Sequence, residues 1–155
     1  MTWTRVILAV GVLAGVLHAS EASAQLASSC TISATSVNFG NYNVFNGSAV
    51  DSTGTITYTC NSAASNITIS LSTGASSTYR PRAMSKGAEA LNYNLFRDAA
   101  RTSIWGDGSN GTAVYSRNNP PNNNAVNLTV YGQIPPGQDV SAGTFSDTVS
   151  ATINF

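Results

Sequence analysis

The stretch FSDTVSATINF, residues 145–155, indicates how this chain folds. In its last part every second side chain is apolar, at Val149, Ala151, Ile153 and Phe155. A period of two is typical of a β-strand that buries one face. Because the pattern continues to the final residue, we expect a core strand that no later part of this sequence covers, and its unpaired edge needs a partner.

Segments of the same kind recur from residue 30 onward, separated by clusters of Gly, Asn, Pro and Ser. No part after residue 25 shows the apolar period of a helix. Pro120 and Pro121 exclude a central strand, and we expect long polar loops at residues 72–89 and 116–125. The pattern predicts an all-β sandwich of immunoglobulin type. The strand-like segments are residues 30–34, 36–42, 54–60, 66–72, 90–96, 125–134 and 147–155.

The N-terminus indicates export. A basic residue precedes an apolar run, residues 6–17, which is too short for a membrane span of roughly 17–25 residues. Small residues in an A-x-A arrangement follow, so we expect signal cleavage between Ala24 and Gln25. The sequence therefore predicts a secretory signal at residues 1–24, one domain at residues 25–155, and no stable membrane insertion.

Cys30 and Cys60 are the two cysteines of the chain. In an exported protein, two thiols indicate one disulfide. Both lie on the apolar faces of their segments, so we expect a buried bridge between two strands. A metal site would need further ligands, and the single histidine, His18, belongs to the expected signal. We therefore expect no metal and no cofactor.

The charges are few and balanced, with seven basic and seven acidic residues. Such a chain lacks the basic surface that nucleic acid or anionic lipid would require. Without a histidine in the exported part, a Ser-His-Asp triad is excluded, and the cysteines are expected to be paired. The acidic residues are scattered and form no recognisable catalytic pair. The sequence thus predicts a protein that is not an enzyme.

Three further motifs have ordinary structural interpretations. GDGSNG, residues 106–111, faintly resembles a calcium loop, but Asp-Gly and Asn-Gly favour a turn. RDAAR, residues 97–101, is either a recognition patch or a strand end at which the aspartate stabilises a turn, and the turn is favoured. Trp105, Tyr79 and Tyr115 are candidates for a sugar-binding platform, although isolated aromatic residues more often pack in a core.

Three stretches together resemble the spore coat protein U family, which includes the major subunits of archaic (Csu-type) chaperone–usher pili. They are CTISATSVNFGNYN (30–43), YNLFRDAARTSIWGDG (93–108) and FSDTVSATINF (145–155). The resemblance covers essentially the whole exported chain. It implies an incomplete immunoglobulin-like sandwich that lacks its last strand and leaves a hydrophobic groove beside the terminal strand.

The resemblance also implies partners. A periplasmic pilus chaperone fills the groove first, and the N-terminal extension of another pilin-like subunit replaces it at an outer-membrane usher. The terminal strand, with Val149, Ala151, Ile153 and Phe155, would then bind the partner by strand addition. The implied setting is the cell surface or an extracellular pilus or coat, with roles in cell adhesion and biofilm formation.

One feature departs from the family pattern. Pilus subunits carry a donor segment of alternating apolar residues before the first cysteine, whereas QLASS, residues 25–29, offers only Leu26. Five residues span roughly 17 Å, which is short for a donor strand. We therefore expect a chain that accepts a strand but does not donate one, as in a terminal pilus subunit. A non-filamentous spore or cell-surface coat protein and an adhesin-like glycan-binding domain are the alternatives.

Overall fold

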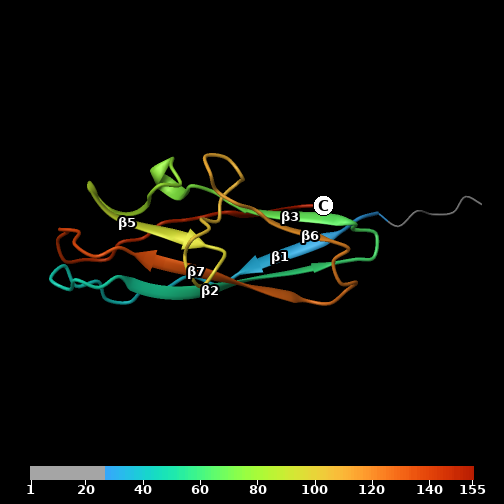
Figure 1. The fold of residues 1–155 in the computed structure, drawn as a ribbon, viewed down its shortest axis with the longest axis horizontal. Coiled ribbons are helices and arrows are strands. Elements are labelled where there is room, and N and C mark those ends of the chain that lie inside the picture. Colours follow the sequence, from blue (N-terminus) through green and yellow to red (C-terminus); the bar gives the residue numbers. More distant parts are fainter. Residues whose placement is uncertain (1–26) are drawn as a thin grey trace, which may run out of the picture.

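Eight strands and one turn of 3-10 helix form the part of the chain that the computed structural model describes, residues 27–155 (Figure 1). The predicted signal and its cleavage site at Ala24 and Gln25 lie outside this part. Within it, no helix is long and apolar enough to cross a membrane. The elements are β1 (Cys30–Ala34), β2 (Val50–Cys60), β3 (Asn66–Leu71), η1 (Gly74–Ser76), β4 (Arg82–Lys86), β5 (Glu89–Phe96), β6 (Tyr115–Asn118), β7 (Val126–Ile134) and β8 (Ala151–Asn154).

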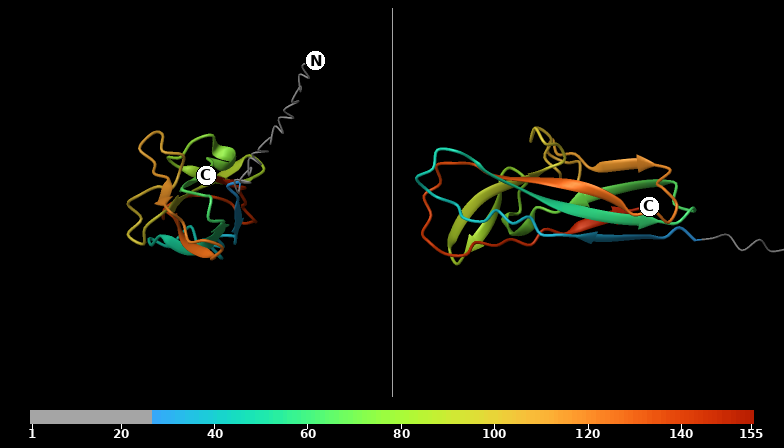
Figure 2. Two further views of the ribbon diagram at one scale, coloured as in Figure 1. Left: turned by 90° about the vertical axis from the view of Figure 1, so that its right-hand side faces the viewer. Right: turned by 90° about the horizontal axis from the view of Figure 1, so that it is seen from below.

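The strands form two sheets, one of five strands in the order β1-β2-β7-β5-β4 and one of three in the order β6-β3-β8. All pairings between these strands are antiparallel. Figures 1 and 2 show the two sheets facing each other along an elongated domain. The predicted all-β, immunoglobulin-like sandwich is therefore confirmed.

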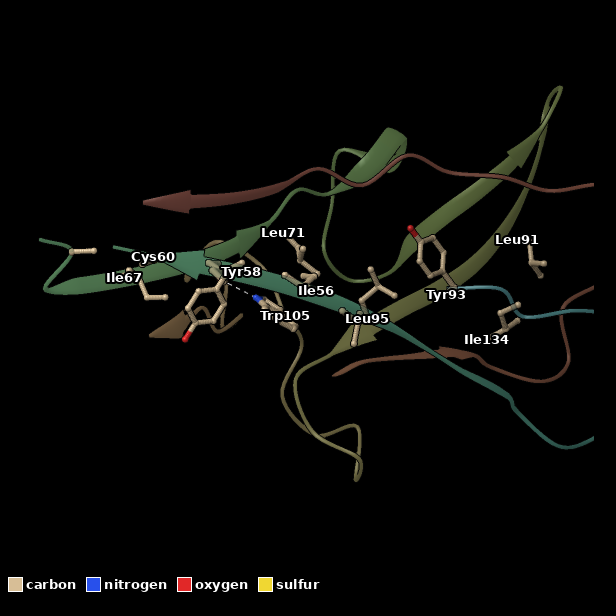
Figure 3. Packing of buried hydrophobic residues seen from close by; sticks show 13 residues of the cluster. Ile56, Tyr58, Cys60, Ile67, Leu71, Leu91, Tyr93, Leu95, Trp105 and Ile134 are labelled. Atoms are coloured by element: carbon tan, nitrogen blue, oxygen red, sulfur yellow. Dashed lines mark hydrogen bonds between the residues drawn. The ribbon is translucent and has the colours of Figure 1, made fainter. Parts of the chain in front are cut away.

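The core lies between the sheets and follows the predicted alternation. Ile56 and Tyr58 of β2 face Ile67 and Ile69 of β3, and all four side chains are buried (Figure 3). Trp105 lies among them, and its indole N–H donates to the Ile69 carbonyl at 2.9 Å. Burying an isoleucine or leucine side chain fully stabilises a fold by roughly 1.5–3 kcal/mol, so this alternation contributes much of the driving force.

The prediction of a strand at residues 36–42 is wrong. The side chains of Val37 and Phe39 do point inward, as the alternation suggested, and both pack against the core. However, no ladder forms here; the Thr35 N–H bonds to β2, and beyond it Ser52 donates a side-chain hydrogen bond to the Asn38 carbonyl. The alternation arises because Val37 and Phe39 pack over Gly54 and Gly132 of the sheet, although the backbone of the segment is not paired as a strand.

The two predicted loops also contain regular structure. Residues 72–89 include η1 and β4, and residues 116–125 overlap β6. The sequence of β4, RAMSK, shows no clear alternation, because its first side chain, Arg82, is buried and polar. Pro120 and Pro121 do lie outside the strands, as predicted.

Candidate strand-binding groove

A groove of about 780 Å³ runs between two chain segments, residues 36–44 and 140–147. Its floor includes Leu91, Tyr93 and Ile134, which are buried side chains of β5 and β7. Figure 3 shows these three side chains at one end of the core, away from the end that holds the disulfide. At this end the sandwich is left open above an apolar floor.

The first wall, residues 36–44, lies over two glycines of the five-stranded sheet. A Cβ atom at Gly54 would come within 2.8 Å of Val37 Cγ2, and one at Gly132 within 2.7 Å of Phe39 Cζ. Real Cβ atoms do not approach other carbons so closely. Both glycines therefore make room for the wall, and a side chain at either position would push it away from the sheet.

Aromatic contacts fix the first wall to the floor. The rings of Phe39 and Tyr93 meet edge to face, with centroids 5.9 Å apart. Such pairs stabilise by about 0.5–1.5 kcal/mol beyond the area that they bury. Farther along, the Tyr42 hydroxyl donates to the Pro135 carbonyl at 3.3 Å and accepts from the Gln138 N–H at 2.9 Å. The wall is thus held at two places along its length.

The second wall is attached to the five-stranded sheet and to η1. Ser146 and Ser85 of β4 exchange two backbone hydrogen bonds, of 2.9 and 3.2 Å. The Asp147 carboxylate accepts from the Tyr93 hydroxyl at 2.7 Å and from the Ala75 N–H at 2.9 Å. Burial, and next the hydrogen bond to Asp147, raise the pKa of the Tyr93 hydroxyl, which stays protonated and remains a donor.

Lys86 secures the outer end of this second wall. Its ammonium group donates to the carbonyl oxygens of Ser141 and Ala142, at 3.2 and 2.9 Å, and to the Ser141 hydroxyl. It also pairs with Glu89 at 2.8 Å and lies 5.1 Å from the centre of the Phe145 ring. Hydrogen bonds from Lys86 and then Ser141 lower the pKa of Glu89. One lysine therefore connects the β4–β5 hairpin to the groove wall.

The two walls of the groove adjoin the edge strands of the two sheets, because residues 36–44 follow β1 and residues 140–147 precede β8. Within residues 27–155, β1 is paired with β2 alone and β8 with β3 alone. The two edges lie side by side with no ladder between them (Figure 2). Some of their Cα atoms are within 8 Å, whereas a strand inserted between two others needs about 9.5 Å, twice the usual spacing. The two edges must therefore move apart to admit a strand.

The hydrogen bonds at the start of β8 show which of its backbone groups are free. The Ser72 N–H donates to the Ser150 carbonyl at 2.9 Å, and the register continues with Ser70 opposite Thr152. In an antiparallel ladder, successive residues direct their N–H and C=O groups to opposite sides. Thr152 thus bonds to β3, while Ala151 and Ile153 present their backbone groups to the groove.

The same reasoning applies to β1. The Thr35 N–H donates to the Thr55 carbonyl at 2.8 Å, in register with Ser33 opposite Thr57. Ile32, one position away from Ser33, therefore directs its backbone groups away from β2. Both edge strands consequently offer free backbone donors and acceptors beside inward apolar side chains.

The structure places three of the four residues predicted for the terminal strand together. Val149, Ala151 and Ile153 are half-buried and pack against the core, while Thr152 is exposed. Phe155 differs, because it follows the end of β8 and is 52% exposed. The predicted orientation of the strand therefore agrees with residues 149–153, but Phe155 lies outside the core.

The predicted disulfide joins Cys30 and Cys60, which stand opposite each other in the β1–β2 ladder. Their Cα atoms are 4.1 Å apart, and Cys60 is buried. The preceding residues are also held: the Ser28 hydroxyl donates to the Ala63 carbonyl at 3.0 Å. The bridge thus fixes one edge of the groove covalently to the five-stranded sheet.

A family model for the Spore Coat Protein U domain matches residues 16–152. The chain belongs to this family. Protein U of Myxococcus xanthus is 40% identical over 65 residues, which are 42% of this chain and 34% of that protein. The matched part is thus about a third of the curated relative. The match also confirms a structural rather than an enzymatic protein.

The fold of this Spore Coat Protein U domain is also found in a solved pilus complex. That structure is the CsuC–CsuE chaperone–tip adhesion subunit pre-assembly complex from the archaic chaperone–usher Csu pili of Acinetobacter baumannii. The TM-score is 0.58 and the sequence identity 26%, over 83% of this chain and 40% of the chain that it matches. This chain therefore spans less than half the length of its structural relative.

The remaining candidate sites of the Spore Coat Protein U domain have structural roles. The Asp107 carboxylate accepts from the Ser109 N–H at 2.9 Å, and Asp98 accepts from the Ser103 N–H at 2.8 Å, so both motifs form turns. No cluster of potential metal ligands occurs among residues 27–155. Trp105 and Tyr79 are buried and cannot form an exposed sugar platform with Tyr115.

Sequence reasoning missed one polar residue of this domain that lies close to the groove. Arg82 is fully buried, and the Tyr79 ring lies 5.0 Å from its guanidinium carbon. Burial lowers the pKa of Arg82, and Tyr93, Tyr79 and Asp147 act in the opposite direction. Nothing in the sequence singles out this arginine, because its acceptors come from distant segments.

Proposed function

We propose that this domain is a structural subunit of an exported surface pilus of the chaperone–usher type. Its groove takes an extended segment of another chain by strand addition. A periplasmic chaperone would supply that segment first, and another pilin-like subunit would replace it at an outer-membrane usher. The observation that carries this proposal is that β1 and β8 have no ladder between them, and that the segments adjoining them, residues 36–44 and 140–147, enclose a groove with an apolar floor.

The chemistry of the groove defines the segment that fits. The floor is apolar, so alternate side chains of the incoming strand must be apolar. Along its borders, the free backbone groups of Ile32, Ala151 and Ile153 need hydrogen-bond partners once water is displaced. An extended peptide satisfies both requirements at once, whereas a helix would leave these groups unpaired. The similarity to a chain of a chaperone–subunit complex supports the same occupant.

The proposal is tested by supplying a strand in the same molecule. A Gly-Ser linker and a strand of about ten residues, alternating valine and threonine, are appended after Phe155 so that the strand can return along β8. We expect a soluble monomer whose unfolding midpoint lies roughly 10 °C or more above that of the unextended chain. The control carries aspartate in place of each valine and gains nothing. An unextended chain that is equally stable and monomeric contradicts the proposal.

A coat protein that does not polymerise is the second candidate, and the similarity to Protein U favours it. Both candidates use the same groove and differ in the assembly. Electron microscopy of cells that produce the chain together with a chaperone and an usher of the archaic chaperone–usher type distinguishes them. Filaments that contain the chain support the pilus subunit, whereas an even surface layer without filaments supports the coat protein.

A further inference from the structure

We propose that Ser72 and Arg82 are positioning residues that fix the register of the terminal strand, and with it the backbone groups that the groove offers to a partner. The inference concerns the first pair of the β3–β8 ladder. The part of the inference that concerns binding of a partner strand rests on the proposed function. The register itself can be tested without any partner.

Arg82 donates two hydrogen bonds to the backbone carbonyl of Ser72. Its Nε and Nη2 atoms both donate to that oxygen, at 3.0 and 2.8 Å. The remaining donors reach Asn94 Oδ1 at 2.8 Å and the Trp105 carbonyl at 2.7 Å. Because the arginine is fully buried and its donors are directed by three partners, it cannot release the Ser72 carbonyl without leaving a buried donor unsatisfied.

Ser72 therefore binds the terminal strand in an unusual way. In a regular antiparallel pair, the Ser150 N–H would donate to the Ser72 carbonyl. Here it donates to the Ser72 hydroxyl at 2.9 Å, while the Ser72 N–H donates to the Ser150 carbonyl at 2.9 Å. The hydroxyl oxygen of Ser72 thus accepts the hydrogen bond in place of the Ser72 carbonyl oxygen, which already accepts from the guanidinium of Arg82. Completing the pair therefore requires a side chain with an acceptor oxygen at position 72.

This pair stands where the chain changes sheets. Ser146 is bonded to β4 of the five-stranded sheet, and Ser150 begins the pairing with β3 of the other. The strand that follows has only four residues, so its own ladder contributes few pairs to the register. A slip of one residue would turn Thr152 inward and would present its backbone, rather than that of Ile153, to the groove.

The test compares Ser72→Thr, which keeps the hydroxyl, with Ser72→Val, which has nearly the same shape and lacks it. Each chain is refolded with an excess of a labelled peptide of about ten residues that alternates valine and threonine. The rate at which the peptide leaves is then measured after adding unlabelled peptide. Amide hydrogen exchange at Ser150 is followed by NMR in the same samples and in chains without peptide.

We expect Ser72→Thr to behave like the natural chain. In Ser72→Val, the Ser150 amide should exchange roughly ten times faster, and the peptide should leave roughly ten times faster, because one hydrogen bond at the end of the ladder is lost. Unchanged exchange at Ser150 overturns the inference. So does faster exchange with an unchanged release rate, since the pair would then have no effect on binding. Failure of every chain to bind the peptide contradicts the proposed function, while the exchange measurement still tests the register.

Discussion

Tyr93 and Asp147 join the floor of the groove to its second wall through a hydrogen bond of 2.7 Å between the hydroxyl and the carboxylate. Tyr93 also meets the ring of Phe39 on the first wall. One side chain of β5 therefore contacts both walls. The width of the groove at this point depends on the contacts of Tyr93. Substituting Tyr93 therefore tests this geometry directly.

Replacing Tyr93 by phenylalanine keeps the ring contact and removes the hydrogen bond. We expect the free energy of unfolding to fall by roughly 1–2 kcal/mol, since Asp147 loses one of its partners. Urea unfolding of the chain that carries an appended strand measures this. Tyr131→Phe is the matched control, because no hydrogen bond of its side chain is found and it is only half-buried; we expect a change within about 0.5 kcal/mol. Equal effects at both positions would show that the Asp147 contact contributes nothing.

Charging the inner face of the terminal strand should abolish partner binding. Ile153→Asp places a carboxylate among apolar side chains without a partner, so we expect the fold to weaken and the chaperone complex to be lost. Thr152→Asp, on the exposed face, should retain the complex. Co-purification with a co-expressed periplasmic pilus chaperone measures both. Similar yields for the two variants would mean that the orientation of β8 is wrong.

A methyl group at Gly132 should disturb the first wall. The new Cβ would lie 2.7 Å from both Phe39 Cζ and Val37 Cγ1, and we expect a loss of roughly 1–3 kcal/mol. The double variant Gly132→Ala, Phe39→Leu shortens the clashing side chain and should recover part of the lost stability. Gly47→Ala serves as the control, since nothing lies within 4 Å of its Cβ position. Equal unfolding temperatures for Gly132→Ala and Gly47→Ala would contradict the packing of the first wall.

The disulfide is expected to form in the exported protein. Non-reduced protein should be lighter than reduced protein by the mass of two hydrogens. Replacing both Cys30 and Cys60 by alanine should lower the free energy of unfolding by about 2–4 kcal/mol, because the unfolded chain is then less constrained. Intact mass spectrometry and urea unfolding provide the two measurements. Free thiols in the folded exported protein would contradict the pairing.

Acid should loosen the second wall at its outer end. The folded-state pKa of Glu89 lies below its ordinary value of 4.5. Its contribution is therefore complete above about pH 4.5 and is lost as the pH falls through the lower folded value. We expect amide exchange in residues 140–146, corrected for the intrinsic pH effect, to accelerate as the pH falls below the ordinary pKa of 4.5 and through the lower folded value. A Glu89→Gln variant should lack this extra acceleration, and an identical profile in both chains would exclude Glu89 as its source.

Much of the sandwich could be predicted because its burial follows a period of two. Ile56, Tyr58, Ile67, Ile69 and Leu95 all lie inward as their spacing indicated. The same rule failed at residues 36–42, since a segment packed over Gly54 and Gly132 alternates as a paired strand does. Periodicity reports which side chains are buried, and it does not report which backbone groups are paired.

The terminal strand could be recognised as a candidate site, whereas most of the groove could not. The floor and walls of the groove come from β5, β7 and two irregular segments that meet only in the folded protein. Arg82 could not be recognised from the sequence for a related reason. A buried arginine depends on acceptors at Ser72, Asn94 and Trp105, and no spacing along the chain connects them.

The bridge between Cys30 and Cys60 also bears on how a filament of such domains would carry mechanical load. A strand held between β1 and β8 transmits tension to both. β1 cannot peel from β2 past its first residue, because that residue is covalently joined to the last residue of β2. β8 has a short ladder of four residues to β3 and no covalent bridge to it. Under force, the contact would therefore yield first along β8, and the five-stranded sheet would remain intact.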